Sequence, residues 1–164
     1  MARRDARIAM LLEIMDASFD RRGWQGTTLR GAVRGVSAAE ALRRPGPGRH
    51  CVWEYVLHCA YWKYAVRRRF QGQAVGSFPR SPANWPEVPR RPDERRWRAD
   101  VGLLIEEHQA LRRLVERLAP AQLERRSAKK AWRNVEQLYG IVAHDLYHTG
   151  QIQLARRLTT RSKR

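Results

Sequence analysis

The stretch from Leu138 to Ala155 reads LYGIVAHDLYHTGQIQLA, and it determines how the rest of the chain is interpreted. Its core-type positions recur at steps of three and four, the spacing of one buried face of an α-helix. That face consists of Leu138, Ile141, His144, His148, Ile152 and Ala155. Two histidines therefore stand one helical turn apart on a face that should point into a core. Because an unpaired polar group is costly to bury, both imidazoles need partners, and one divalent metal ion would satisfy both.

The same periodicity predicts four long helices, over about residues 5–22, 50–71, 93–119 and 134–158. Shorter helical turns are expected at 27–33, after Ser37 and at 121–126, and Ser37 with Glu40 has the spacing of a capping box. The sequence therefore predicts an all-α fold, a four-helix bundle with short extra helices in its connections. It is expected to form one domain of residues 1–158, followed by a basic tail of residues 159–164.

The second predicted helix places another histidine, His58, on its inward face. That face runs through Cys51, Tyr55, His58, Trp62 and Ala65, with Arg69 as a further candidate. Three neutral imidazoles bind zinc or a similar ion well, and three protein ligands leave a position open for water or a substrate. The candidate metal site is His58, His144 and His148, with zinc or nickel as the expected ion.

Other readings of these residues stay open. Two histidines four apart on a helix are common without a metal, and distance along the chain does not show that His58 lies opposite them. His108, on the face of the third predicted helix, is expected to be a core or boundary residue. Asp145 and Glu54 are either acceptors for the N–H groups of the ligands or ordinary solvated helix residues.

The charge of the chain is strongly positive, with 33 Lys and Arg against 16 Asp and Glu in 164 residues. Such an excess suggests attraction to nucleic acid or anionic surfaces. The arginines are scattered from Arg3 to Arg164, however, and no groove-reading element accompanies them, so a solvated basic surface is favoured and specific nucleic-acid binding is not expected.

The positions of the cysteines and the hydropathy of the chain indicate the cellular compartment in which it is expected. Cys51 and Cys59 lie eight residues apart in one predicted helix, too far apart to bridge each other, which fits a reduced, cytoplasmic setting. The first residues do not have the pattern of a secretory signal. No apolar run approaches the roughly 20 residues of a membrane span, so no membrane partner is expected.

Several stretches resemble the DinB family. The segment from Trp53 to Trp62, WEYVLHCAYW, looks like that family's second helix, and His144 to Ile152 resembles its fourth-helix motif of two histidines followed by Gly-Gln. The Pro45–Gly48 stop and the Asn84-Trp85-Pro86 loop are also similar. The resemblance implies a four-helix bundle, often dimeric, with a divalent metal held by His58, His144 and His148. It also implies either a metal-dependent hydrolase of the YfiT type or an enzyme that uses a low-molecular-weight thiol.

The leading hypothesis is therefore a metal-dependent, homodimeric enzyme, with thiol transfer ahead of hydrolysis. Arginines at the mouth of the pocket, from Arg67–Arg69 or the 79–92 loop, would hold the carboxylates of such a thiol. The alternatives are a basic protein that binds nucleic acid without specificity and a catalytically silent interaction protein. The sequence names neither the substrate nor the catalytic residues.

Overall fold

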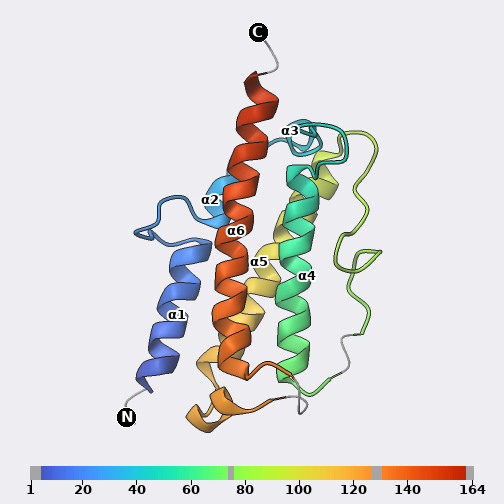
Figure 1. The fold of residues 1–164 in the computed structure, drawn as a ribbon. Coiled ribbons are helices and arrows are strands. Elements are labelled where there is room, and N and C mark those ends of the chain that lie inside the picture. The colour runs from blue at the N-terminus through green and yellow to red at the C-terminus, as the bar shows by residue number, and fades with distance from the viewer. Residues whose placement is uncertain (1–4, 74–75, 127–130, 162–164) are drawn as a thin grey trace.

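Four long helices run side by side in the computed structural model, which describes residues 5–73, 76–126 and 131–161 (Figure 1). They are α1 (Ala6–Phe19), α4 (Val52–Phe70), α5 (Glu94–Glu116) and α6 (Asn134–Arg161). The connections contain two short helices, α2 (Leu29–Val33) and α3 (Ala38–Ala41), and a 3₁₀ turn, η1 (Pro120–Glu124). The described residues contain no strand, so the prediction of an all-α fold is confirmed for this part of the chain.

Helices α1, α2, α3 and α5 begin at polar side chains that accept hydrogen bonds from their first turns. The Asp93 carboxylate accepts from the backbone N–H of Arg96 at 2.9 Å, and Ser37 with Glu40 forms the reciprocal capping box. Helix α6 ends at Arg161, inside the segment expected to form a tail. The rest of that segment, residues 162–164, lies outside the described residues.

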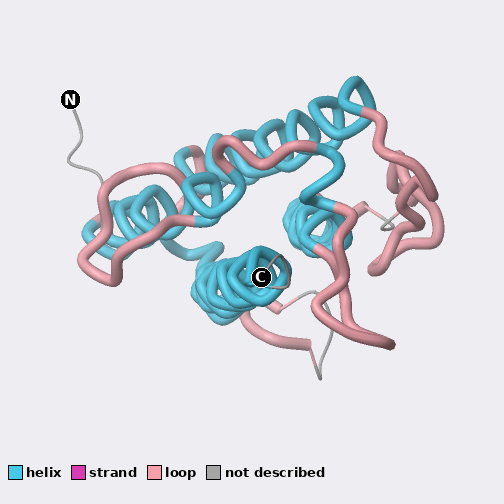
Figure 2. The backbone as a smooth tube through the Cα atoms, turned by 90° about the horizontal axis from the view of Figure 1, so that it is seen from above, coloured by secondary structure: helices cyan, strands magenta, loops and turns pink. Residues whose placement is uncertain are grey.

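Helix α4 packs against both α5 and α6, and α1 packs against α5 and α6 from the other side. Figure 2 shows this arrangement from above, with the long 71–93 connection outside α4. The core has two parts. Trp53, Trp97 and Ile152 belong to one, and Leu11, Leu111 and Leu138 belong to the other. No helix in the described ranges is both long and apolar enough to cross a membrane.

The buried face of α4 is broader than the single stripe predicted from the sequence. Val52, Trp53 and Leu57 lie fully inside the core, whereas Tyr55 and Trp62 are half-buried and Arg69 is exposed. The predicted single stripe is the pattern of a helix that has a neighbour on one side only. Because α5 and α6 cover α4 on two sides, residues between the expected core positions are also buried.

His108 is a core histidine, as expected, and takes no part in the cluster described below. Its ring stacks on Phe19 of α1, with 3.6 Å between ring centroids, and the residue is 4% exposed. Burial is the main cause that lowers the pKa of His108 to about 2, and the nearby cations Lys63 and Arg112 contribute in the same direction. The folded protein therefore holds this imidazole neutral at any ordinary pH.

This neutral histidine should cost stability in acid. The unfolded chain binds a proton at this residue below a pKa of about 6.5 and the folded protein does not, so stability is lost as the pH falls below that value. Replacing His108 by Phe keeps the stacking and removes the proton. Between pH 7 and pH 5, wild type should lose about 2 kcal/mol more unfolding free energy than His108→Phe. Urea unfolding of both proteins with a chelator present measures this difference, and equal pH dependence would contradict it.

Candidate metal centre

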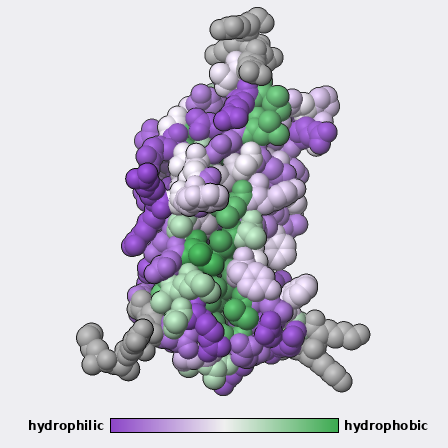
Figure 3. All heavy atoms as spheres, turned by 60° about the vertical axis from the view of Figure 1, so that its left-hand side comes forward, coloured by the Kyte–Doolittle hydropathy of each residue, from purple (hydrophilic) through white to green (hydrophobic). Residues whose placement is uncertain are grey.

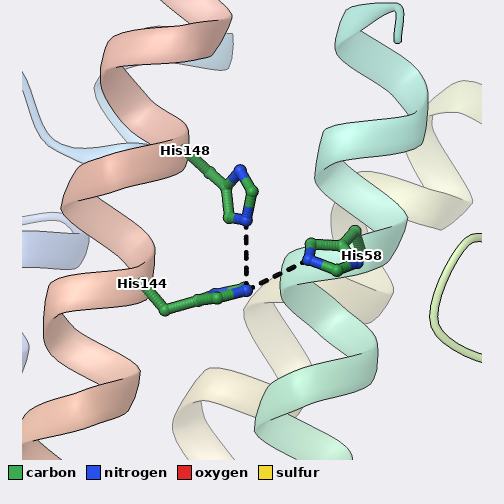
Figure 4. Close-up of side chains that lie close together, drawn as sticks. All are labelled: His58, His144 and His148. Atoms are coloured by element: carbon green, nitrogen blue, oxygen red, sulfur yellow. Dashed lines mark hydrogen bonds between the residues drawn. The ribbon is translucent and has the colours of Figure 1, made fainter.

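Three imidazoles converge in the core from two helices, His58 from α4 and His144 and His148 from α6 (Figure 4). The Nε2 atom of His144 lies 3.1 Å from Nε2 of His58 and 3.1 Å from Nε2 of His148. One ring nitrogen from each residue falls within 4.8 Å of the other two. The structure thus brings together all three residues that the sequence singled out. Their role as ligands stays a prediction.

Groups outside the cluster hold two of the rings in one orientation. The Nδ1–H group of His58 donates to the backbone carbonyl of Asn84 at 2.7 Å. The Nδ1–H group of His148 donates to Oε1 of Gln151 at 2.6 Å, one turn along α6. Because a neutral imidazole carries one proton, these bonds leave the Nε2 lone pairs of both rings pointing at His144. Such outer hydrogen bonds are the usual support of metal-binding histidines.

The ring of His144 cannot donate a hydrogen bond to both of the Nε2 lone pairs that face it. The Nδ1 atom of His144 is buried and has no hydrogen-bond partner among the described residues. A proton on its Nε2 could serve only one of the two facing lone pairs, and a proton on its Nδ1 would leave three lone pairs facing one another. A cation at the convergence point removes the conflict. Tetrahedral zinc with Zn–N bonds near 2.05 Å would place its nitrogens about 3.3 Å apart, close to the observed spacing.

Burial keeps the three rings neutral, the state in which imidazole binds a metal. It lowers the pKa of His58 to about 4 and that of His144 to about 3, and it lowers the pKa of His148 as well. The charge of His148 is the next cause of the lowering at His144. His58 and His148 are buried and His144 is half-buried.

The loop around Asn84 closes one side of the cluster. The indole of Trp85 lies between two histidine rings, stacked on His58 at 3.8 Å and on His50 at 3.7 Å. Asn84 has a left-handed backbone with φ of 70°, a conformation that asparagine tolerates, and its side-chain oxygen accepts from the indole N–H of Trp62 at 2.9 Å. The contact of Trp85 with His58 was not predicted from the sequence. The length of this proline-rich loop was the available signal for a role at the site.

Of the two readings left open for Asp145 and Glu54, the structure does not bear out the one in which they accept from the histidine N–H groups. Asp145 forms an ion pair with Lys63 in the core, and Glu54 binds Arg44, with 2.6 Å between the nearest atoms. The supporting acceptors are instead the Asn84 carbonyl and the Gln151 amide. Each carboxylate has a cation within reach, which is a stronger partner than the neutral N–H group of a histidine.

A second set of metal-type side chains overlaps the first. Cys59, His144 and Asp145 also have one ligand atom each within 4.8 Å of one another. Cys59 is fully buried, and burial raises the pKa of its thiol, which disfavours the thiolate that a metal needs. Asp145 already neutralises Lys63. The three-histidine set therefore fits an ion better.

Two pockets flank the histidines along α6. One, here the His144 pocket, is lined by His144 and by α6 residues on its N-terminal side, together with Trp62, Val66 and Arg69 of α4. The other, here the Tyr55 pocket, is lined by Tyr55, Gln151 and α6 residues toward its C-terminus, together with the Pro45–Arg49 turn. Gln151 also bonds His148, so each pocket has a wall residue in or next to the cluster.

Comparison of the chain with known proteins and protein families identifies its family. No curated protein and no solved structure matches the chain. A sequence profile of the DinB superfamily matches residues 3–152, which includes all three histidines and the Asn84 loop. With this match covering most of the chain, the family expectation from the sequence is confirmed, and the protein belongs to the DinB superfamily.

Proposed function

We propose that this protein is a divalent-metal-dependent enzyme with a four-helix bundle of the DinB type. His58, His144 and His148 would bind the ion, zinc or nickel, and leave a position open for a reactant. One observation carries the proposal: the Nε2 atoms of three histidines converge at 3.1 Å spacings, and the one proton that His144 could place there can serve only one of the two lone pairs that face it. Family membership supports it independently.

The ion would supply Lewis acidity, lowering the pKa of a thiol or water at neutral pH. The chain would supply the rest. The Asn84 carbonyl and the Gln151 amide hold two rings in the required tautomer, and Trp85 shields His58 from water. These contacts preorganise the site so that it need not rearrange when a ligand enters.

Thiol transfer is favoured over hydrolysis because a hydrolase needs a general base beside the attacking water. The carboxylates on the two helices that carry the histidines are already held by cations: Asp145 by Lys63, Glu54 by Arg44 and Glu136 by Arg133. A thiol needs no such base once its proton has left to solvent. Its sulfur then forms a bond to the electrophilic carbon, and the leaving group departs with the electron pair of the broken bond.

Cobalt substitution tests this assignment. Cobalt-loaded protein titrated with cysteamine, a small model thiol, should develop a sulfur-to-cobalt charge-transfer band in the near ultraviolet. The band should persist in Cys51→Ala,Cys59→Ala, which excludes the sulfur atoms of the chain, and should vanish in His144→Ala,His148→Ala. A cobalt-loaded wild type without the band would refute thiol binding and return hydrolysis to first place.

The proposal includes a homodimer in a reducing, cytoplasmic setting. Large apolar side chains are exposed on α1 and α6: Met10, Ile14, Tyr139, Tyr147, Leu154 and Leu158. Figure 3 brings α1 and the adjoining side of α6 forward and shows a hydrophobic strip running along this face. Contiguous apolar strips of this kind usually mark an interface. Both cysteines are buried and unbonded, which supports the reducing setting.

Sedimentation at micromolar concentration should therefore give twice the mass of one chain. Leu154→Glu places a charge on the strip and is expected to shift the protein to monomers, because an unpaired charge in a dry interface is costly. Ala99→Glu, at an exposed position of α5, is the matched control and should remain dimeric. A wild-type protein that sediments as a monomer would contradict the dimer.

A further inference from the structure

The His144 pocket has a volume of about 410 Å³, within the range of roughly 300–1,000 Å³ typical of small-molecule sites. Its walls are almost entirely apolar. Trp62, Trp132 and Tyr139 contribute aromatic surface, and Val66 and Ile141 contribute aliphatic surface. Trp132, which is not part of the strip proposed for the dimer, is 70% exposed in spite of its size, so aromatic surface of this pocket is accessible to a ligand. A flat apolar body would be buried here with few polar losses.

Arg69 is the one cationic side chain among the described residues that line this pocket. The guanidinium of Arg69 lies over the ring of Trp62, 5.7 Å from its centroid, and has no ion pair within the described part of the chain. Its neighbour Arg67 differs, because that side chain is held by Glu107 at 2.9 Å. Of the arginines proposed from the sequence to hold a carboxylate, Arg69 is the one that lines this pocket.

The acidic residue of the pocket does not cancel this charge. Glu136 lies 3.3 Å from the guanidinium of Arg133 and 3.9 Å from that of Arg126. It also accepts a hydrogen bond from the backbone N–H of Arg133, which lowers the pKa of its carboxyl further than the Arg133 side chain alone would. The available charge of the pocket is therefore positive, and an anionic group fits beside Arg69.

The Tyr55 pocket is more polar than the His144 pocket and therefore suits the thiol reactant better. The Tyr55 pocket, of about 580 Å³, offers a phenol, the Gln151 amide and the guanidinium of Arg49. A hydroxyl-rich or amide-rich thiol could form hydrogen bonds there, whereas in the His144 pocket its polar groups would be left unpaired. The two pockets adjoin the histidine cluster from opposite directions along α6, so two reactants could approach it together.

We infer that the His144 pocket binds the electrophilic co-reactant, a small molecule with a flat, aromatic-like apolar body and one carboxylate that pairs with Arg69. The role as co-reactant rests on the proposed function. The binding itself does not, because it depends on Trp62, Trp132 and Arg69 and on no metal.

Calorimetric titration with 2-naphthoate tests the inference on the full chain, once metal-loaded and once with chelator. Binding is expected in both states. The neutral isostere 2-naphthamide should bind about tenfold more weakly, since one charge-assisted contact at an exposed arginine is lost. Arg69→Gln should weaken 2-naphthoate by a similar factor and leave 2-naphthamide unchanged. Arg98→Gln, which removes an exposed arginine of α5, is the charge-matched control and should bind as wild type.

A second variant tests the location. Gly140 lines the pocket, and a Cβ atom added there has no neighbouring atom within 4 Å outside its own helix backbone, so Gly140→Leu should extend into the cavity without displacing the helix. It should abolish 2-naphthoate binding, whereas Gly102→Leu, at an equally open helical glycine of α5, should not. If the wild-type protein does not bind a metal but still binds 2-naphthoate, the proposed function is contradicted and the pocket inference is not. No binding of 2-naphthoate by a metal-loaded protein, or binding indifferent to both Arg69→Gln and Gly140→Leu, would overturn the pocket inference alone.

Discussion

Replacing Asp145 by Ala is expected to destabilise the protein by about 3–5 kcal/mol. Asp145 and Lys63 form an ion pair deep between α4 and α6, with side-chain exposures of 3% and 1%. Burial raises the pKa of the Asp145 carboxyl, and the ammonium of Lys63 opposes that change. Removing the carboxylate leaves a buried ammonium without a counter-charge, and that cost dominates.

Urea unfolding of chelated protein measures the loss. The double variant Lys63→Met,Asp145→Leu should recover most of it, because replacing both charges by apolar groups of similar volume leaves no unpaired ion. Asp16→Ala is the comparison. Asp16 is also buried, but its partner Arg112 has a side chain that is 28% exposed, so the cation left behind still reaches water and the loss should be smaller. A loss below about 1 kcal/mol in Asp145→Ala would contradict this account of the core.

The second large effect concerns metal affinity. Single changes of His58, His144 or His148 to Ala should each weaken zinc binding by more than about 100-fold. Loss of an outer hydrogen bond to a ligand alone costs roughly 10–100-fold, and loss of a ligand must cost more. His108→Phe should bind zinc as wild type does, because its ring stacks on Phe19 away from the cluster.

A graded series makes this prediction sharper. Gln151→Leu removes the acceptor of the His148 N–H group and keeps all three rings, so it should fall in the intermediate range of roughly 10–100-fold. Competition titration with a chromophoric chelator measures wild type, these five single variants and the double variant His144→Ala,His148→Ala. Full zinc occupancy in His144→Ala,His148→Ala would rule out the site.

The local signals in the sequence were sufficient for the long helices and for the shared face of His144 and His148, but not for the position of His58 opposite them. Capping residues such as Asp93 and Ser37 act within one helical turn, so their position in the sequence already determines where a helix begins. The inward stripe of α6 placed His144 and His148 correctly for the same reason, because residues four apart share a face whatever surrounds the helix.

The features that the sequence left undetermined depend on contacts between distant segments. Asp145 pairs with Lys63, 82 residues away, and this partner could not be read from the neighbours of Asp145. The stacking of Trp85 on His58 depends on how a long loop folds back over α4. The broad buried face of α4 follows from two covering helices, and periodicity along one helix does not report how many neighbours it has.

X-ray absorption at the zinc edge of metal-loaded, untagged protein tests the central claim most directly. Three imidazole nitrogens at about 2.0–2.1 Å and one further light atom are expected, the arrangement of three histidines with an open position. A sulfur atom at about 2.3 Å would instead place the metal with Cys59, and fewer than three imidazoles would contradict the three-histidine site.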